Sequence, residues 1–480
     1  MSASGKICHM PTRDNVVARS LFVFYLGLVV VFCLAGAWTK SPDPDEASFY
    51  LPAFKWIWDT FPRLSLDYPL PELPTTLYFQ TLIFGASGHN VVAVRGLSSI
   101  AVLIVAAFLF FGSFLRPSSN LRKLQILVLL CNPFLFWNVF TAKSHAIAVA
   151  ALLAGVVAWQ RLGPATRSPH VIIAVAGLAV AGTSSQAALP VCAGLLASEA
   201  LATVERLLKG SAGRLDGGTP NSSRPSCHDT FPVTPGLLRS VKAVFRQIVR
   251  GEGSVIGGRL LAPALPLFAA LVLFAFWGGF EPPSYEVFLR EKMGGWGLEA
   301  EVGRFSNPLP HAALFLISVG AWLSPMILQF RRRQIVTLVW LAWPLAAVLV
   351  EVSGLYRPGE PFLAVAAGPL STALRWASGG SHWLLVLSAG FIAALALLIL
   401  LPDFTRAAPG GRAAQITLLC CIGAAAGVPY LFESYSLYAI MGIGALLLTG
   451  EVGERRIAKL HAAAVAGAGV LYAAVKLFGQ

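Results

Sequence analysis

Charged residues are scarce in this sequence. Of its 480 residues only 12% are Asp, Glu, Lys or Arg, against about a quarter in a typical soluble domain, while 56% are hydrophobic. Cysteines are also few: the seven are scattered, and no two share an expected outer loop, which argues against a disulfide framework or a zinc site. Short segments of alternating polarity, the pattern of a transmembrane barrel, are missing as well. The chain is therefore predicted to be a helical membrane protein.

Long apolar runs fill the sequence instead, and each is close to the ~20 residues that cross a bilayer. They predict an all-α, polytopic transmembrane bundle of about 13 spans. The expected spans are 20–38, 92–115, 124–140, 145–160, 171–184, 186–203, 257–279, 310–329, 335–353, 382–401, 414–431, 436–450 and 461–478. The first run is too long for a signal-peptide core and lacks a clear cleavage site, so it is expected to be a retained span.

The net charge of +13 is distributed unevenly between the two sides of this arrangement. If the N-terminus is inside, the basic residues fall in inner loops, whereas the outer loops 39–91 and 278–309 hold more acids than bases. Positively charged inner loops set membrane topology, so this pattern predicts an N-in orientation. Basic residues interleaved with aromatics on one patch are not found, which argues against nucleic-acid binding.

The long polar segment 204–256 divides the chain. Its first part is rich in Gly, Ser, Pro and Thr and is expected to be a cytoplasmic linker, and 236–250 has the spacing of an amphipathic surface helix. We therefore expect an N-terminal transmembrane module, 1–203, with a functional first outer loop, and a C-terminal module, 257–480. The segment 361–377 is too short and too polar for a span and is expected to lie at the membrane interface.

Adjacent acids stand directly after the first span, in "SPDPDEASFYLPAFKW", residues 41–56. The aromatic residues that follow predict a helix lying flat at the outer membrane surface. At that depth Asp45 and Glu46 can meet both a lipid headgroup and a water-soluble molecule, and partial burial favours a general base. The alternative is structural, because acids also cap helix N-termini.

This region resembles the GT-C glycosyltransferases, which use polyprenyl- or dolichyl-phosphate sugars and include the protein O-mannosyltransferases and the lipid A aminoarabinose transferase. "PDEASFYLPA" is similar to their Asp-Glu-containing first outer loop. The resemblance continues through "LPTTLYFQTLIFGASGHNVVAVRG" and "NPFLFWNVFTAKSHAIAVAALLAG", over about the first third of the chain. Two departures occur: Thr75 replaces the second proline before the tyrosine, and Lys143 and His145 stand where Arg and Tyr are usual.

The resemblance implies roles for individual residues. Asp45 is expected to be the base, with Glu46 orienting the acceptor or substituting for it. Lys143 and His145 are expected to bind substrate, although Lys143 is equally compatible with a snorkelling role and His145 with simple packing. The resemblance admits a divalent cation at the acid pair, but no His or further acid cluster supports a metal site there.

Two further places add candidate substrate-binding residues on the outer side. "GLYRPGEPF" puts Tyr356 and Arg357 at the surface after the ninth span, where Arg357 either binds phosphate or anchors the loop. Arg95, near the start of the second span, faces either the cleft or the headgroups. These residues complete the predicted site.

The expected function is transfer of a sugar from a polyprenyl- or dolichyl-phosphate carrier to a hydroxyl of a glycan, lipid or protein acceptor, with inversion. A membrane transporter or lipid-linked-glycan flippase is the main alternative, and a non-catalytic scaffold is a third. Transporters place charges or broken helices at mid-bilayer, whereas the expected spans here are nearly free of charge. Ala- and Gly-rich spans favour a bacterial cytoplasmic membrane, with the endoplasmic reticulum as the other option.

Overall fold

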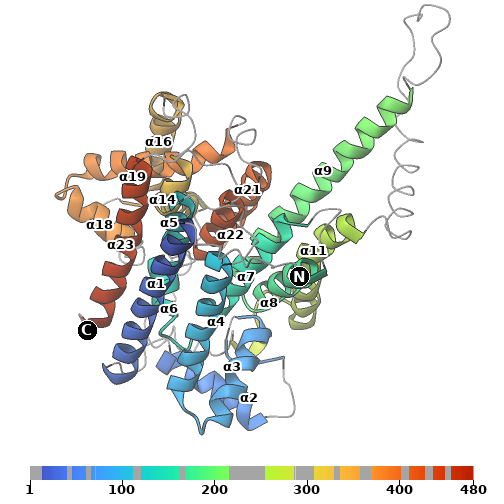
Figure 1. Ribbon diagram of the computed structural model, residues 1–480, viewed down its shortest axis with the longest axis vertical. Helices are drawn as coiled ribbons and strands as arrows, with labels where there is room; N and C mark the ends of the chain where they lie inside the picture. Colours follow the sequence, from blue (N-terminus) through green and yellow to red (C-terminus); the bar gives the residue numbers. More distant parts are fainter. Residues whose placement is uncertain are drawn as a thin grey trace, which may run out of the picture.

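A computed structural model describes residues 13–39, 46–60, 66–70, 72–111, 120–162, 168–215, 254–285, 287, 308–328, 336–356, 369–401, 410–427, 436–448 and 456–478. Within these ranges the regular structure is helical throughout, as the apolar runs predict (Figure 1). The helices are α1 (Arg13–Thr39), η1 (Glu46–Tyr50), α2 (Leu51–Thr60), α3 (Pro74–Ala86), α4 (Val91–Phe111), α5 (Asn120–Leu130), α6 (Pro133–Asn138), α7 (His145–Gln160), α8 (Ser168–Gly182), η2 (Gln186–Ala188), α9 (Leu189–Leu215), α11 (Ser254–Trp277), α14 (Pro308–Ile327), η3 (Leu338–Ala342), α16 (Trp343–Ser353), α18 (Pro369–Ala377), α19 (His382–Leu397), η4 (Leu398–Leu400), α21 (Gly411–Gly427), α22 (Leu437–Leu447) and α23 (Arg456–Phe478).

Seven helical segments in the described part of the chain are long and apolar enough to cross a membrane. They are Val16–Gly36, Val91–Phe111, Gln186–Arg206, Gly257–Trp277, Pro308–Ile327, His382–Leu400 and Arg456–Val475. Five shorter apolar helices, including α7 and α22, coincide with other expected spans. The protein is therefore a helical protein with membrane-spanning character, whereas the figure of about 13 spans stays a prediction.

The expected span 124–140 is interrupted. Helix α5 ends at Leu130 and α6 begins at Pro133, with Asn132 as its N-cap. The Asn132 side chain accepts a hydrogen bond from the Phe134 N–H at 3.1 Å. Because proline lacks an N–H and disfavours helical geometry in the residue before it, the chain turns here instead of continuing as one helix. Sequence hydropathy alone did not predict this break.

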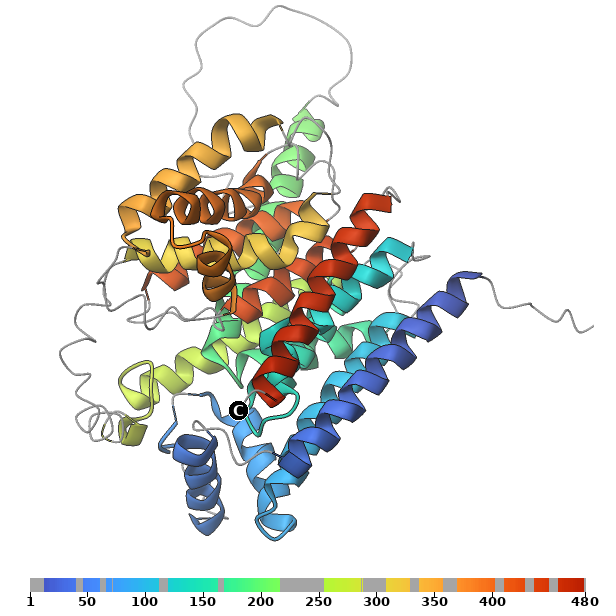
Figure 2. The same cartoon turned by 90° about the vertical axis from the view of Figure 1, so that its left-hand side faces the viewer.

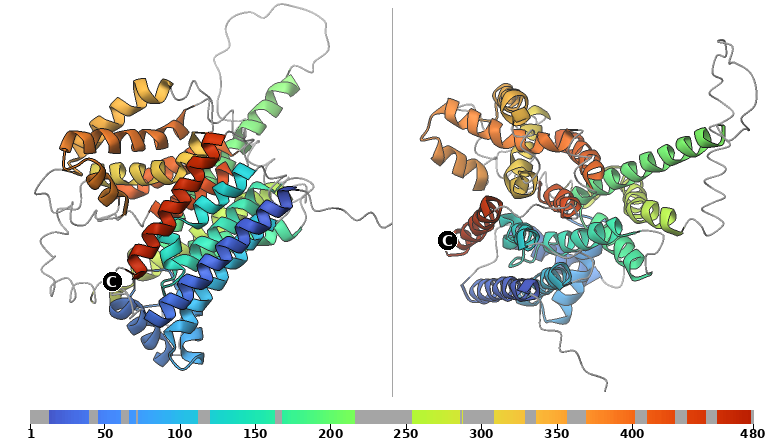
Figure 3. Two further views of the ribbon diagram at one scale, coloured as in Figure 1. Left: turned by 60° about the vertical axis from the view of Figure 1, so that its left-hand side comes forward. Right: turned by 45° about the horizontal axis from the view of Figure 1, so that its top comes forward.

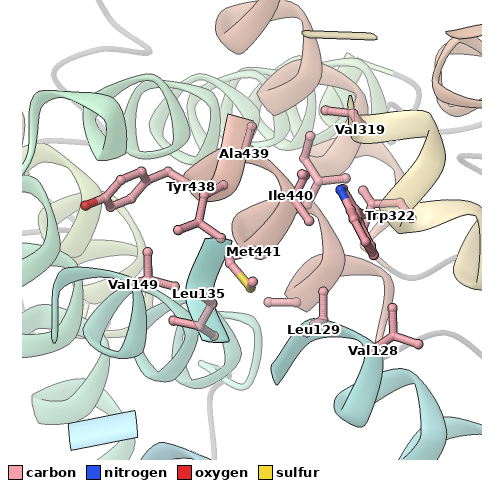
Figure 4. Packing of buried hydrophobic residues seen from close by; sticks show 14 of the residues in the cluster. Val128, Leu129, Leu135, Val149, Val319, Trp322, Tyr438, Ala439, Ile440 and Met441 are labelled. Carbon is pink, nitrogen blue, oxygen red and sulfur yellow. The ribbon is translucent and has the colours of Figure 1, made fainter. Parts of the chain in front are cut away.

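The main apolar core lies where the helices cross at close range. A Cβ placed on Gly155 of α7 would come within 2.7 Å of the Leu178 backbone nitrogen of α8, and one on Gly177 within 2.8 Å of Gly155 Cα. Glycine at both positions lets the two backbones touch, as is common between membrane helices. Figure 4 shows the neighbouring part of the core, where Met441 and Ile440 of α22 face Leu129 and Trp322.

The two expected modules pack against each other. Helix α11, the first of the C-terminal module, contacts α8 and α9, so the linker connects segments that are already neighbours in space. Helix α9 continues to Leu215 and projects beyond the other helices in Figure 1 and in the right-hand view of Figure 3. The predicted amphipathic helix 236–250 lies outside the described residues.

Of the predicted interfacial segment 361–377, the described part forms α18. Its Trp376 side chain is 88% exposed, whereas Ser371 and Leu374 are buried. One face of this short helix therefore packs on the protein and the other presents a large aromatic ring, as an interfacial helix requires.

The described residues of the expected first outer loop, 39–91, form a small helical layer at one end of the bundle. Helices α2 and α3 lie side by side there, below α4 in Figure 1 and at the base of the molecule in Figure 2. A second apolar cluster, separate from the main core, holds them together; it includes Tyr50, Phe54, Tyr68, Leu77 and Trp277. As expected, a helical segment begins here, and its first residue is Glu46, the second acid of the pair.

Candidate active site

Glu46, one of the two predicted acids, is completely buried. Both carboxylate oxygens contact Arg95 of α4: Arg95 Nε donates to Oε1 at 3.1 Å, and Arg95 Nη2 donates to Oε2 at 2.6 Å. The backbone N–H of Ala142 donates to Oε1 as well. Arg95 also reaches the Gly36 carbonyl at the end of α1, at 3.4 Å. The pair thus ties together η1, α1, α4 and the segment before α7.

This geometry gives Glu46 and Arg95 a joint role. A bidentate pair to guanidinium fixes a carboxylate strongly in position, and both oxygens of Glu46 are already engaged. Glu46 is therefore better placed to hold the Ala142 backbone than to receive a substrate proton. Arg95 faces Glu46 and is buried. Asp45 lies outside the described residues.

Glu72 is a second buried carboxylate, and sequence reasoning missed it. Its side chain accepts hydrogen bonds from the hydroxyl groups of Tyr50 and Ser144, and its carbonyl oxygen accepts one from the Tyr68 hydroxyl at 2.7 Å. Only 7% of the residue is exposed. Hydrogen bonds from three different segments fix Glu72 at the point where the first outer loop meets α7.

Burial raises the pKa of Glu72 from its ordinary value to about 7, although the Tyr50 hydrogen bond and the Lys143 charge oppose the shift. Removing a carboxylate from water disfavours its charged form, and neutral hydroxyl donors compensate for only part of that cost. Near neutral pH, Glu72 is therefore divided between the acid and the carboxylate. Groups with such pKa values are concentrated at functional sites.

The predicted substrate-binding residues Lys143 and His145 lie beside Glu72. His145 Nε2 is 3.7 Å from Glu72 Oε1, and His145 Nδ1 is 3.0 Å from the Tyr438 hydroxyl of α22. The Lys143 side chain is partly buried, and its carbonyl accepts a hydrogen bond from Gln80 at 3.2 Å. Residues 142–145 thus connect the Glu46 pair to the Glu72 cluster.

Hydroxyl groups extend this polar region along the start of α3. Thr75 donates its hydroxyl to that of Thr183 at 2.8 Å, and Thr76 donates to Ser184. Thr183 and Ser184 form the turn after α8. Thr75 is exposed, whereas Thr76, Ser184, Ser144 and Glu72 are buried, so these groups form a largely buried, hydrogen-bonded cluster.

Two contacts fix the segment that carries Glu72. Ser284 donates to Asp67 through both its backbone N–H, at 2.7 Å, and its hydroxyl, at 2.8 Å. The Trp277 indole donates to the Leu66 carbonyl at 2.8 Å. The end of α11 and the turn after it therefore support the first outer loop.

Tyr356 is not part of this cluster. It is buried in the main apolar core three residues after α16, whereas Tyr50 and Tyr68 belong to the second apolar cluster. Helix α16 contacts α14, α19 and η3, and it is drawn far from α2 and α3 in Figures 1 and 2. The structure thus does not bring Tyr356 to the other predicted residues, and Arg357 lies outside the described residues.

Metal-ligating residues do not converge in the described ranges, where no group of three or more His, Cys, Asp or Glu side chains could hold an ion. Glu72 and His145 are close, but the other nearby ligands are hydroxyl groups. A divalent cation at Asp45 and Glu46 stays an untested expectation, because Asp45 is not among the described residues.

Comparison with known proteins found no matching family model, no matching curated protein and no matching solved structure.

Glu72 and Tyr438 are the residues that the sequence did not reveal. Glu72 stands in "DYPLPELPTT", a proline-rich stretch typical of an ordinary loop. Its one visible signal is an acid directly before a helix that begins with proline. Tyr438 gives no signal at all, since it lies in an apolar run far along the chain.

Proposed function

We propose that this protein is a membrane glycosyltransferase that moves a sugar from a polyprenyl- or dolichyl-phosphate carrier to a hydroxyl acceptor. The observation that carries the proposal is the convergence of Glu46, Glu72, Lys143 and His145 at one end of an all-helical bundle. Acids and cations set next to membrane-length helices suit a donor with a lipid tail and a reactive, anionic head.

Lys143 is the proposed cationic phosphate ligand, and His145, which burial and the Lys143 charge keep neutral, is proposed as a hydrogen-bonding ligand. They flank Ser144 at the N-terminus of α7, where the first backbone N–H groups of the helix face outward and add a favourable dipole. The sequence assigns Arg357 to the same task. Cations stabilise the negative charge that grows on a departing phosphate, and such electrostatic stabilisation often contributes more to catalysis than any other single effect.

The proposed reaction is a direct displacement. A base takes the proton of the acceptor hydroxyl, the acceptor oxygen attacks the anomeric carbon, and the carrier phosphate leaves, so the configuration inverts. Asp45 keeps the role of base that the sequence assigns to it. Glu46 is assigned to positioning, since its contacts with Arg95 and Ala142 hold the segment that presents Lys143.

The proposed location is the outer face of a bacterial cytoplasmic membrane, where polyprenyl-phosphate sugars and cell-envelope acceptors meet. The sugar and the acceptor would both be identified by analysis of cells that lack the protein. The experiment must distinguish this glycosyltransferase activity from that of a transporter or flippase.

The test is mass spectrometry of lipids and glycans from cells that lack the protein. We expect one sugar modification to disappear and its lipid carrier to accumulate. Complementation with Asp45→Asn should fail to restore the sugar, whereas Asp59→Asn, an exposed acid of the same loop, should restore it. Restoration by Asp45→Asn would contradict the assigned base. A carrier trapped on the inner side of the membrane would indicate a flippase.

A further inference from the structure

Glu72 and its neighbours allow a more specific inference, which rests on the proposed function. We propose that Glu72 acts as a carboxylic acid and passes a proton through the Ser144 hydroxyl to the phosphate group that leaves the sugar. Glu72 would be a positioning residue, because it acts through Ser144, and its role is opposite to that of the base.

Ser144 provides the path. It stands directly before α7 but makes no side-chain cap for that helix, and its hydroxyl is hydrogen-bonded to Glu72 instead. A hydroxyl group can accept one hydrogen bond while it donates another. Ser144 is also the chain neighbour of Lys143, the proposed phosphate ligand. In the structure Ser144 is the donor to Glu72 Oε2; with a proton on Oε2 the bond reverses, and Ser144 can then pass a proton on to a phosphate held by Lys143.

Burial of Glu72 favours the neutral acid, whereas the donors around it and the Lys143 charge act in the opposite direction. Its side-chain donors are the uncharged hydroxyl groups of Tyr50 and Ser144, while Lys143 and His145 are the charged or titratable groups nearby. Glu46, by contrast, holds a guanidinium. A carboxylate at Glu72 would repel an incoming phosphate, whereas the acid can donate to it.

The chemistry of the leaving group gives the proton a destination. The donor carries a phosphodiester with one negative charge, and the bond from the anomeric carbon to the phosphate oxygen breaks with its electron pair left on that oxygen. The product is a phosphomonoester whose second pKa is near 6, close to that of Glu72. Asp45 takes the acceptor proton and later releases it to water, and Glu72 regains one from water, so protons balance over the cycle.

His145 and Tyr438 hold the other side of the Glu72 carboxyl group in place. The hydrogen bond between His145 Nδ1 and the Tyr438 hydroxyl orients the ring so that Nε2 faces Glu72 Oε1. In Figure 4 the Tyr438 hydroxyl points away from Met441 and Ile440. Both residues would then act by positioning, without contact with the sugar.

The decisive measurement is the pH dependence of sugar transfer. An acid at Glu72 predicts that the wild-type rate falls as pH rises through about 7, by about fivefold between pH 7 and pH 8 as the acid form is lost. Glu72→Gln keeps hydrogen bonding without titrating, so it should retain partial activity and lose this alkaline fall. Tyr438→Phe should lower the rate and leave the shape of the profile unchanged. A rate that rises through pH 7, or complete inactivity of Glu72→Gln with correct folding, would overturn the proposal.

A second readout does not depend on sugar transfer. Infrared difference spectra of the purified protein should show a protonated carboxyl band at pH 6 that fades by pH 8 and is missing in Glu72→Gln. A short-chain polyprenyl monophosphate should bind more weakly to the wild type at pH 8 than at pH 6. The phosphate of this probe also titrates in that range, so its binding to Glu72→Gln at the same two pH values measures the contribution of the phosphate, which is then subtracted. A fully ionised Glu72 at pH 6 would refute the acid. Failure of the wild type to transfer any sugar would instead refute the proposed function.

Discussion

Glu46 and Glu72 are both buried but have different partners. Glu46 meets the Arg95 guanidinium and a backbone N–H, whereas Glu72 meets the hydroxyl groups of Tyr50 and Ser144. A buried carboxylate opposite a permanent cation forms an ion pair. One surrounded by neutral donors has a raised pKa and can exchange a proton near neutrality. The charge of the partner, more than the burial, separates a structural acid from a reactive one.

The largest effect is expected from breaking the Glu46 pair. Arg95→Met leaves a buried carboxylate without its cation, which should lower the free energy of unfolding by roughly 3–5 kcal/mol. Thermal unfolding in detergent measures this loss. The double variant Glu46→Gln with Arg95→Met should recover much of it, because no charge is then left unpaired. An unchanged melting temperature for Arg95→Met alone would contradict the structural role of the pair.

The raised pKa of Glu72 should make the free energy of unfolding depend on pH. Its folded pKa is raised from 4.5 to about 7, so its favourable contribution is complete below pH 4.5 and is lost as pH rises through 7. Glu72→Gln should therefore gain stability relative to the wild type between pH 5 and pH 8, by up to about 3 kcal/mol. Unfolding curves at both pH values test this. A constant difference between the two proteins would place the Glu72 pKa in its ordinary range.

Removing the strongest donor to Glu72 gives the next effect. Tyr50→Phe deletes the hydroxyl that opposes the raised pKa, so the pKa of Glu72 should rise further above 7, and stability should fall by about 1–3 kcal/mol. Infrared titration of the carboxyl band measures the pKa. As a matched control, Tyr78→Phe in the same layer should leave the band in place.

Loss of Lys143 should also raise the pKa of Glu72, but by a smaller amount than loss of the Tyr50 hydroxyl. Lys143→Met removes a nearby positive charge that lowers the pKa of Glu72, so the pKa should rise by less than in Tyr50→Phe. The same titration provides the comparison. A fall in the pKa on losing Lys143 would show that the two groups do not interact as the structure indicates.

The smallest loss of stability is expected from weakening the contact between Ser284, which follows α11, and Asp67. Ser284→Ala removes one hydroxyl bond to Asp67 and keeps the backbone bond, so it should cost about 1 kcal/mol. Proteolysis of the first outer loop under native conditions should become faster, since that loop is then held less firmly. Equal proteolysis rates would indicate that the backbone bond alone is sufficient.

Sequence patterns predicted the helical class, most of the apolar helices and the helix that begins at Glu46. They worked because hydropathy and interfacial aromatics act locally along the chain. The break at Asn132 and Pro133 was missed, since hydropathy averages across it.

The site was predicted less completely, for a physical reason. Lys143 and His145 were identified, but the partner of Glu46 was not, because the contact with Arg95 joins residues 49 positions apart. Glu72 has an unremarkable local sequence, and its properties come from Tyr50, Ser144 and the loss of water around it. Such long-range effects on a single acid are invisible without the fold.

The contacts of Trp277 with Leu66 and of Ser284 with Asp67 also have a consequence for biogenesis. They join parts of the chain 211 and 217 residues apart. The loop bearing Glu72 can therefore make these contacts only after the ribosome has synthesised the intervening residues. A chain that ends within 204–256 would contain the acid pair and Lys143 but would lack Trp277 and Ser284, whose hydrogen bonds hold the segment that carries Glu72. Complete support of this layer therefore requires that α11 has been synthesised.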